Sequence, residues 1–282
     1  MSESNVRLKL SITSRPNKTT MKQVSILLLI IVLASFKTKE PAFFDVKHIK
    51  KDFVRVKEGL YFSKYETTNV EYRNFLSALL SNSQTELYKR SLPDSTCWRD
   101  KLTYNEPFVN YYFRSPAFDH YPVVGVSYEL AKEYCSWLTK SYNENPKRKF
   151  RKVEFILPSK EEWIFAANQG DTTKAYTWGT GFMQNNRKKD LCNYRHVAGG
   201  STAVEKELDR KMIAASVDSY FPNSFGIYNM CGNVAEMVSE KGLAKGGSYD
   251  DLPYQVMISS EKKYTNPTAD IGFRVAMRVM EE

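Results

Sequence analysis

Hydrophobic positions recur with helical spacing in three separate segments of the chain. The three apolar stripes are Tyr72, Phe75, Leu76, Leu79 and Leu80; Ala131, Tyr134, Cys135 and Leu138, with Trp137 alongside; and Trp163, Ala166 and Ala167. A repeat of three or four residues is the period of one face of an α-helix. The pattern therefore predicts three amphipathic helices, and Gly170 can end the third.

Polar residues in front of these stripes are suited to capping the helices. Thr68 and Ser159 are each followed three residues later by a glutamate, Glu71 and Glu162. This spacing forms a capping box, in which side chain and backbone satisfy each other's hydrogen bonds. Ser127 stands in front of the second stripe. The three helices are therefore expected to start at these capping residues.

The remaining pattern is that of short strands and loops. Residues 53–56 and 60–62 flank a Lys-Glu-Gly turn and predict a hairpin. From Asp171 onward Gly, Asn, Asp and aromatic residues recur without a long period, with brief strand-like runs such as Phe273–Met277. Helices first and loops with short strands later indicate an α+β fold. No linker interrupts residues 41–282, so they are expected to form one domain.

An apolar run near the start predicts export. Val24–Phe36 is apolar apart from two serines, follows Lys22 and ends in small residues. It is shorter than the ~20 residues of a membrane-spanning helix and has the layout of a secretory signal. Residues 1–40 are thus expected to be a leader, with Met21 as a possible true start, and the mature protein to lie in the periplasm or cell envelope without a membrane span. A buried helix or an uncleaved anchor is the alternative.

Composition and charge narrow the class of protein. The chain has 282 residues, with 41 Lys and Arg against 32 Asp and Glu, a net charge of +9, and 13% aromatic residues. This composition is globular and excludes a collagen, a coiled coil and a disulfide-dense miniprotein. The leader carries seven basic and two acidic residues, so +4 remains for residues 41–282. We interpret that charge as spread over the surface, whereas a nucleic-acid-binding protein has clustered basic residues, so no nucleic-acid partner is expected.

The four cysteines do not form a metal motif. Cys97, Cys135, Cys192 and Cys231 are far apart and none belongs to a CxxC pair. Their disulfide pairing stays open in an exported protein. Buried thiols are equally compatible with the pattern, most clearly for Cys135 on its apolar helix face.

Seven segments in order resemble one known family, that of the formylglycine-generating enzyme, also called sulfatase-modifying factor. They are KYETTNVEYRNFL (64–76), YPVVGVSYELAKEYCSWL (121–138), LPSKEEWIFAA (157–167), YTWG (176–179), NSFGIYNMCGNVAEMVSE (223–240), KGGSYDD (245–251) and GFRVA (272–276). The resemblance runs from about Phe53 to Met277. It implies a loop-rich, single-domain variant of the C-type lectin fold.

Residues 92–126 narrow the resemblance further. They are similar to the corresponding stretch of the gliding-motility lipoproteins of Bacteroidetes, which belong to the type IX secretion apparatus. This implies a protein-interaction role in an assembly of the cell envelope, with secretion or gliding components as partners. The chain departs from those proteins because no lipid-acceptor cysteine follows its apolar run.

The resemblance also implies where an active site would lie. Members of the family oxidise a sulfatase cysteine with two copper-binding cysteines that follow a Gly-Gly-Ser-aromatic motif, here Gly246–Tyr249. The matching positions are Asp251 and Gln255, and no cysteine occurs from Gly232 to Glu282. A carboxylate and an amide cannot replace the soft thiolates that suit Cu(I). We expect no catalytic residue and no copper. An oxidase with a displaced site and a lectin-like module binding glycan or peptide are the alternatives.

Iron chemistry is not expected either. Other branches of the superfamily hold iron with a His-x3-His-x-Glu motif. The three histidines, His48, His120 and His196, are isolated and none fits that spacing. Ser248 lacks the surroundings of a nucleophile elbow and is interpreted as a turn residue.

Structural calcium is the cofactor that the resemblance implies. By the match to residues 228–236, Asn229 and Glu236 would supply side-chain oxygens, and Gly232 and Val234 main-chain carbonyls. These are hard oxygen donors of the kind Ca²⁺ prefers. The alternative is that Asn229 and Glu236 only form hydrogen bonds within the loop. A second family site would map to the side chains of Asn193 and Asp209 and the carbonyls of Tyr194 and Lys211.

An aromatic cluster precedes the second helix. It comprises Tyr111, Tyr112, Phe113 and Phe118, in front of Tyr121. Such a cluster can be a ligand platform, but more often packs in a core or lies at a protein interface. Packing, with part of the cluster at an interface, is the preferred interpretation.

Overall fold

The computed structural model describes residues 49, 51–99, 104–179, 181–196 and 213–282. The described residues belong to one compact unit, Pro41–Glu282. The predicted leader, residues 1–40, lies outside the described residues. Within the described ranges, no helix combines the length and apolar composition needed to cross a bilayer.

All three predicted helices are present and begin after the predicted caps. They are α3 (Asn69–Ser81), α6 (Tyr128–Asn143) and α7 (Lys160–Asn168). The capping boxes at α3 and α7 are both formed, and the Ser127 side chain accepts from the backbone of Leu130. Shorter elements lie between them: α4 (Thr85–Ser91), η1 (Ser95–Trp98), α5 (Glu106–Tyr111) and η2 (Pro116–Phe118).

Three local predictions need correction. Leu80 is 49% exposed, because the buried stripe of α3 ends at Leu79. The helix α7 is terminated by Gln169 in the left-handed conformation (φ 60°), and Gly170 follows it in the same region. The run 273–277 is only partly a strand, since the last strand begins at Ala276.

Two small four-stranded sheets follow from the short apolar runs. The predicted hairpin is present as β1 (Phe53–Lys57) and β2 (Leu60–Ser63). It joins β3 (Lys152–Ile156) and β8 (Ala276–Glu281) in an antiparallel sheet of order β1-β2-β8-β3. The second sheet has order β6-β5-β4-β7, and only β4 and β7 pair in parallel. Its strands are β4 (Ala235–Met237), β5 (Leu243–Lys245), β6 (Glu261–Lys263) and β7 (Ile271–Gly272), with η3 (Pro253–Val256) before β6.

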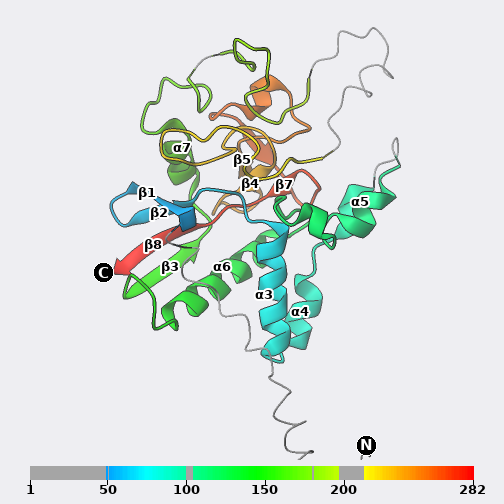
Figure 1. Cartoon of the computed structure of the whole chain (residues 1–282), viewed down its shortest axis with the longest axis vertical. Coiled ribbons are helices and arrows are strands. Elements are labelled where there is room, and N and C mark those ends of the chain that lie inside the picture. Colours follow the sequence, from blue (N-terminus) through cyan, green and yellow to red (C-terminus); the bar gives the residue numbers. More distant parts are fainter. Residues whose placement is uncertain (1–48, 50, 100–103, 180, 197–212) are drawn as a thin grey trace, which may run out of the picture. The chain divides into compact units, whose positions relative to one another are not determined.

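Helices and loops occupy opposite sides of these sheets. The helices α3, α4 and α6 lie below the strands in Figure 1, with α6 along β3, and the loops that follow α7 lie above them. The buried residues of α3 and α6 form one core with Phe155 and Phe273. A second core gathers Trp163 of α7 and Phe62 of β2 with the loop residues. A buried polar centre lies between these elements, with residues from β4 and from the segment between β7 and β8.

Candidate functional site

The buried polar centre of the molecule is built around Arg274, in the segment between β7 and β8. Its side chain is 0% exposed. The guanidinium donates to both carboxylate oxygens of Glu236, at 2.7 Å from Nε and 2.6 Å from Nη2. The other donors reach the carbonyls of Ser63, Lys64 and Tyr228 at 2.8–3.1 Å. All five N–H groups of the guanidinium are therefore satisfied by groups that come from distant parts of the chain.

Glu236 on β4 connects this centre to α7. Its Oε2 also accepts a hydrogen bond of 2.7 Å from the indole Nε1 of Trp163. Both partners are fully buried, so the bond forms away from water. The Glu236 carboxylate thus holds α7, β4 and the segment before β8 together.

A second buried carboxylate, Glu66, faces the same arginine. Its Oε1 accepts from Asn233 Nδ2 at 2.8 Å and its Oε2 from Asn229 Nδ2 at 3.2 Å. Arg274 Nη2 lies 4.0 Å from Oε2. Burial raises the pKa of Glu66 to about 7, while Arg274 opposes that shift. With both carboxylates ionised, two negative charges would share one positive charge.

The residues predicted to hold calcium all lie in the buried loop beside this centre. Asn229, Gly232, Val234 and Glu236 are each buried. The Asn229 Oδ1 atom is buried and has no hydrogen-bond partner in the described part of the chain. Gly232 has φ 76°, and a Cβ there would lie 2.3 Å from the carbonyl oxygen of Asn193, so only glycine fits. The unpartnered oxygen and the hard oxygen donors suit Ca²⁺, although both Glu236 oxygens already accept from Arg274 or Trp163.

Half of the second predicted calcium site can be described. The Asn193 side chain donates to Asn233 Oδ1 at 3.2 Å, and Tyr194 stacks on His196 with ring centroids 4.7 Å apart. Asp209 and Lys211 lie outside the described residues. The structure therefore shows Asn193 as a neighbour of the buried centre, and the calcium assignment stays a prediction.

The positions matched to the copper-binding cysteines serve a network of ion pairs and caps. Asp251 is 6% exposed and accepts from Lys262 Nζ at 2.6 Å and from the backbone N of Ser248 at 2.9 Å. Lys262 also pairs with Asp270. Burial favours the neutral amine, but these two carboxylates raise the pKa of Lys262 above its usual value. The arrangement holds the loop after β5 to β6 and to the segment before β7.

Gln255 has a local role in the same region. Its Oε1 accepts from the backbone N of Leu252 at 2.9 Å and caps η3. Since no cysteine occurs between Gly232 and Glu282, the absence of a thiol pair does not depend on the exact residues matched.

The four cysteines lie in described segments, and none forms a disulfide in the structure. Burial raises the pKa of Cys97 and of Cys231 to about 12 and that of Cys135 still further. These three thiols therefore stay protonated at neutral pH, which makes them poor nucleophiles and poor metal ligands. Among the described residues, no group of three or more His, Cys, Asp or Glu side chains could hold a metal ion.

Most of the predicted aromatic cluster packs internally. Tyr112 is 1% exposed, lies 4.5 Å from Trp98 and 5.1 Å from Phe118 between ring centroids, and donates its hydroxyl to the carbonyl of Pro122. Tyr111 is 60% exposed and Tyr104 nearby is 81% exposed. The preference for packing is confirmed for Tyr112, and the exposed tyrosines leave a surface open to a partner.

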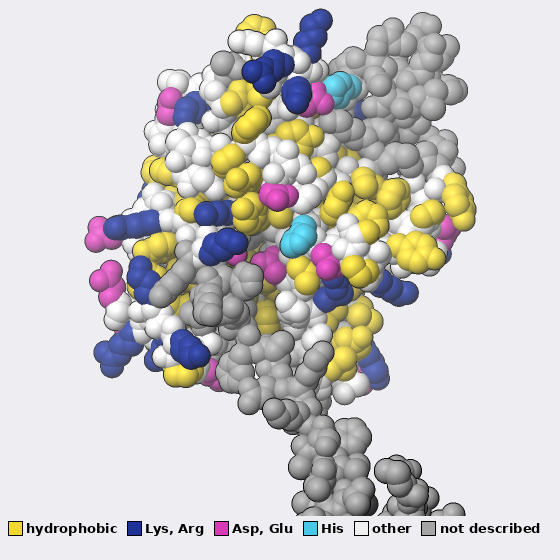
Figure 2. Space-filling model, in the orientation of Figure 1, with side chains coloured by type: hydrophobic (Ala, Val, Ile, Leu, Met, Phe, Trp, Pro, Cys, Tyr) yellow, Lys and Arg dark blue, Asp and Glu magenta, His cyan; other side chains and the backbone are white. Residues whose placement is uncertain are grey.

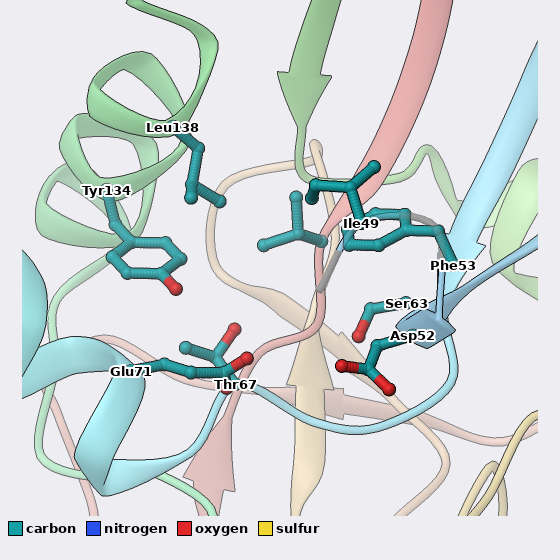
Figure 3. Close-up of a pocket in the computed structure, with 9 residues that line it drawn as sticks. Ile49, Asp52, Phe53, Ser63, Thr67, Glu71, Tyr134 and Leu138 are labelled. Atoms are coloured by element: carbon teal, nitrogen blue, oxygen red, sulfur yellow. The ribbon is translucent and has the colours of Figure 1, made fainter. Parts of the chain in front are cut away.

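A cavity of about 30 Å³ lies beside α3 and α6. In Figure 3, Asp52 and Glu71 point toward it from opposite sides, with the Tyr134 hydroxyl above Glu71. The lining is completed by Ile49, Phe53, Ser63, Thr67, Leu138 and Val275. This volume suits one or two water molecules and is too small for a substrate.

Sequence reasoning missed Glu66, Trp163 and Arg274 as members of the polar centre. Trp163 was predicted to be buried, which is correct, but nothing in the sequence links it to Glu236. Glu66 is separated from Asn233 by 167 residues, and no spacing rule connects them. An arginine in the otherwise apolar run 271–277 was the one available signal.

Comparisons with known proteins agree with the fold. The sequence matches the family model of the sulfatase-modifying factor enzyme 1-like domain over residues 36–279. It is 25% identical over 197 residues to the inactive C-alpha-formylglycine-generating enzyme 2 of Bos taurus, covering 63% of this chain and 58% of that protein. It is 31% identical over 121 residues to the formylglycine-generating enzyme of Streptomyces coelicolor, covering 43% of this chain and 32% of the enzyme.

The chain thus spans less than two thirds of the length of either of these relatives. Among solved structures, the Treponema denticola variable protein 1 is similar with a TM-score of 0.49 and 16% identity, over 78% of this chain and 84% of that one. The structure of CarF is similar with a TM-score of 0.49 and 22% identity, over 79% and 87%.

Proposed function

Because the chain belongs to the sulfatase-modifying factor enzyme 1-like domain family, we propose that it is a non-catalytic member that uses the fold to bind other proteins of the cell envelope. The observation that carries this proposal is the region of the family's copper site. There Asp251 is bonded to Lys262 and Gln255 caps η3. A site with no thiol within it does not fit copper, because the chemistry needs two soft ligands. The similarity to a relative named inactive is a further argument.

An activity assay tests the absence of catalysis. The purified full chain is incubated with copper, oxygen, a thiol reductant and a Cys-x-Pro-x-Arg peptide, next to an active formylglycine-generating enzyme. We expect mass spectrometry to find no conversion of the peptide cysteine to the aldehyde. Circular dichroism on the same sample establishes that the protein is folded. Conversion above the enzyme-free blank would favour the alternative, an oxidase with a displaced site.

We further propose that the protein is exported and joins an envelope assembly of the gliding or type IX secretion type. The apolar run with its preceding lysine supports export, and the similarity of residues 92–126 supports the assembly. Mass analysis of the mature N-terminus should find cleavage near Ala34–Phe36. A cytoplasmic product that begins at Met1 or Met21 would contradict export.

The exposed tyrosines Tyr104 and Tyr111 are the surface at which we place the partner. Aromatic residues are enriched at interfaces, and both side chains are more than half exposed. Cross-linking in intact cells should yield fewer adducts to secretion or gliding components for the variant Tyr104→Ala/Tyr111→Ala than for wild type. Tyr254→Ala, which removes a tyrosine elsewhere that is about as exposed as Tyr111, serves as the control. Unchanged adducts, or specific binding on a glycan array, would favour the lectin-like alternative.

We propose that calcium binds in the loop from Asn229 to Glu236. The support is the buried Oδ1 of Asn229 without a partner and the excess of buried carboxylate over Arg274. Bound calcium would hold the loop by contacts to Asn229 and to main-chain carbonyls. Metal analysis of protein purified without chelators should find about one calcium per chain. If no calcium is found, the proposal is wrong and hydrogen bonds alone hold the loop.

A further inference from the structure

The loop between α7 and the buried centre carries a rigid turn at residues 184–190. Gln184 and Asp190 form an isolated bridge, and the backbone N of Asn185 donates to the carbonyl of Lys189 at 2.9 Å. The Asn185 side chain accepts from the backbone of Arg187 at 2.9 Å and of Lys189 at 3.1 Å. These bonds fix the backbone, so the side chains at the end of the turn project from a defined frame.

Three consecutive basic residues occupy the end of this turn. Arg187, Lys188 and Lys189 are all exposed, and none has an ion-pair partner within the described ranges. The adjacent Asp190 is turned back into the loop, where it accepts from Gln184 and contacts His196 Nε2 at 2.9 Å. The positive charge is therefore not neutralised by the nearest carboxylate.

An exposed apolar side chain lies at the base of the same turn. Phe182 is 77% exposed, and its carbonyl accepts from the indole Nε1 of Trp178 at 2.9 Å. The neighbouring Met183 carbonyl accepts from Leu191 N at 2.9 Å, which closes the turn behind it. In Figure 2, Lys and Arg side chains gather with hydrophobic side chains at the end of the molecule where Figure 1 shows the loops after α7.

We propose that this basic tip, defined as Phe182 with Arg187–Lys189, docks on a membrane surface rich in anionic phospholipid. Each Lys or Arg near such a surface is attracted to it, and an adjacent aromatic ring can enter the interface. Three exposed positive charges next to an exposed aromatic ring are complementary in charge to an anionic lipid surface. The inference is independent of the missing thiol pair.

A site-specific measurement avoids interference from the apolar run at residues 24–36. Hydrogen exchange of the full chain is followed by mass spectrometry with vesicles of phosphatidylglycerol and phosphatidylcholine, and with vesicles of phosphatidylcholine alone. We expect slower exchange at residues 182–189 with the anionic vesicles only, reversed by high salt because the attraction is screened. No protection, or equal protection by neutral vesicles, would overturn the proposal.

Two triple variants with equal net charge provide the matched comparison. Arg187→Gln/Lys188→Gln/Lys189→Gln should abolish the protection and weaken salt-sensitive vesicle binding roughly a hundredfold, since each charge contributes about fivefold. Lys147→Gln/Lys149→Gln/Lys152→Gln removes three exposed charges from the connection after α6 and the first residue of β3, and it should leave both unchanged. If both variants lose vesicle binding equally, the net charge of the protein alone drives binding. That result would contradict a specific role of the basic tip.

Insertion of the aromatic ring is tested separately. In Phe182→Trp, the added indole should be quenched by brominated anionic lipid beyond the wild-type level, and in Tyr111→Trp it should not. The same exchange measurement is made with an oligonucleotide and with a polyglutamate peptide. If either protects residues 182–189 and anionic vesicles do not, the membrane proposal is wrong and the partner is a soluble polyanion.

Discussion

At the scale of single residues, Arg274 determines how the loops are joined. Its five donors reach groups from the hairpin, the loop before β4 and β4 itself, and every one is satisfied. Removal of one partner of a buried ion pair leaves the other charged and unsolvated. In this molecule Glu236 and Glu66 would both lose their counter-charge.

The first prediction follows from this contact set. Arg274→Met should lower the free energy of unfolding by about 3–5 kcal/mol, and Arg274→Lys should recover only part of that because an ammonium cannot bind both Glu236 oxygens and three carbonyls at once. Arg278→Met is the control, since the exposed pair of Arg278 with Glu162 is expected to contribute less than about 1 kcal/mol. Urea unfolding followed by tryptophan fluorescence measures both, and equal effects would contradict the assigned role.

The second prediction concerns pH. Lys245 on β5 is fully buried, its Nζ donates to the carbonyl of Ser260, and burial lowers its pKa to about 8. The folded state then releases this proton at lower pH than the unfolded state, whose lysine has a pKa near 10.4. Stability should therefore rise between about pH 8 and 10.4, by on the order of 3 kcal/mol relative to Lys245→Met. Parallel pH profiles of the two proteins in urea would refute the assignment.

The residues of the polar centre show what the sequence could and could not reveal. The family motif predicts Glu236 as a calcium ligand, which stays a prediction, and the structure shows its carboxylate bonded to Arg274 and Trp163. Its observed partners, Arg274 and Trp163, come from segments 38 and 73 residues away. Such contacts are fixed by the packing of whole elements, and hydrophobic period, capping and turn rules act only over a few residues.

At the scale of elements, helix starts were predicted correctly because their determinants are local. A capping side chain and its glutamate lie within one turn of each other, so their spacing is readable in the sequence. The strands from β4 onward contain two or three residues except β8, too few to show an alternating pattern. The boundary error at β8 arises because the apolar run 271–277 continues through β7 and the segment before β8. The unpredicted helices α4 and α5 have only seven and six residues.

The third prediction addresses the caps. Ser159→Ala should destabilise the protein by about 1 kcal/mol, because the N–H of Glu162 loses its acceptor at the start of α7. Ser127→Ala at α6 should cost a similar amount. Ser77→Ala, on the exposed face of α3, should change stability by less than about 0.5 kcal/mol and serves as the control. Thermal and urea unfolding provide the comparison, and equal effects at all three positions would argue against capping.

At the scale of the whole molecule, the loop-rich half has few backbone hydrogen bonds between strands. The fourth prediction is that bound calcium stabilises this half in their place. Chelation should lower the melting temperature, since a ligand 100-fold above its dissociation constant adds about 2.7 kcal/mol. Asn229→Ala should reduce the response, whereas Asn185→Ala, in the turn of the basic tip, should not. Glu236→Gln is a poor test because it also breaks the pair with Arg274. An unchanged melting temperature of the wild-type protein after addition of a chelator would contradict the prediction.

The distribution of positive charge on the surface differs from what the net charge of the domain suggests. Counted along the chain, the excess of basic residues in 41–282 is small, which predicts a positive charge spread over the surface. The structure exposes two basic stretches, 147–152 and 187–189, in which most side chains face solvent. The basic residues of each stretch are near neighbours along the chain, and the net charge of residues 41–282 does not show such runs.

The order of the first sheet has a consequence for the timing of synthesis. The strand β8 lies between β2 and β3, so the earliest hairpin of the domain and the middle of the chain both wait for residues 276–281. Until the ribosome has added and released that segment, β2 and β3 each lack a neighbour and Arg274 has not reached its carbonyls. The first sheet is therefore completed only after the whole domain has been translated.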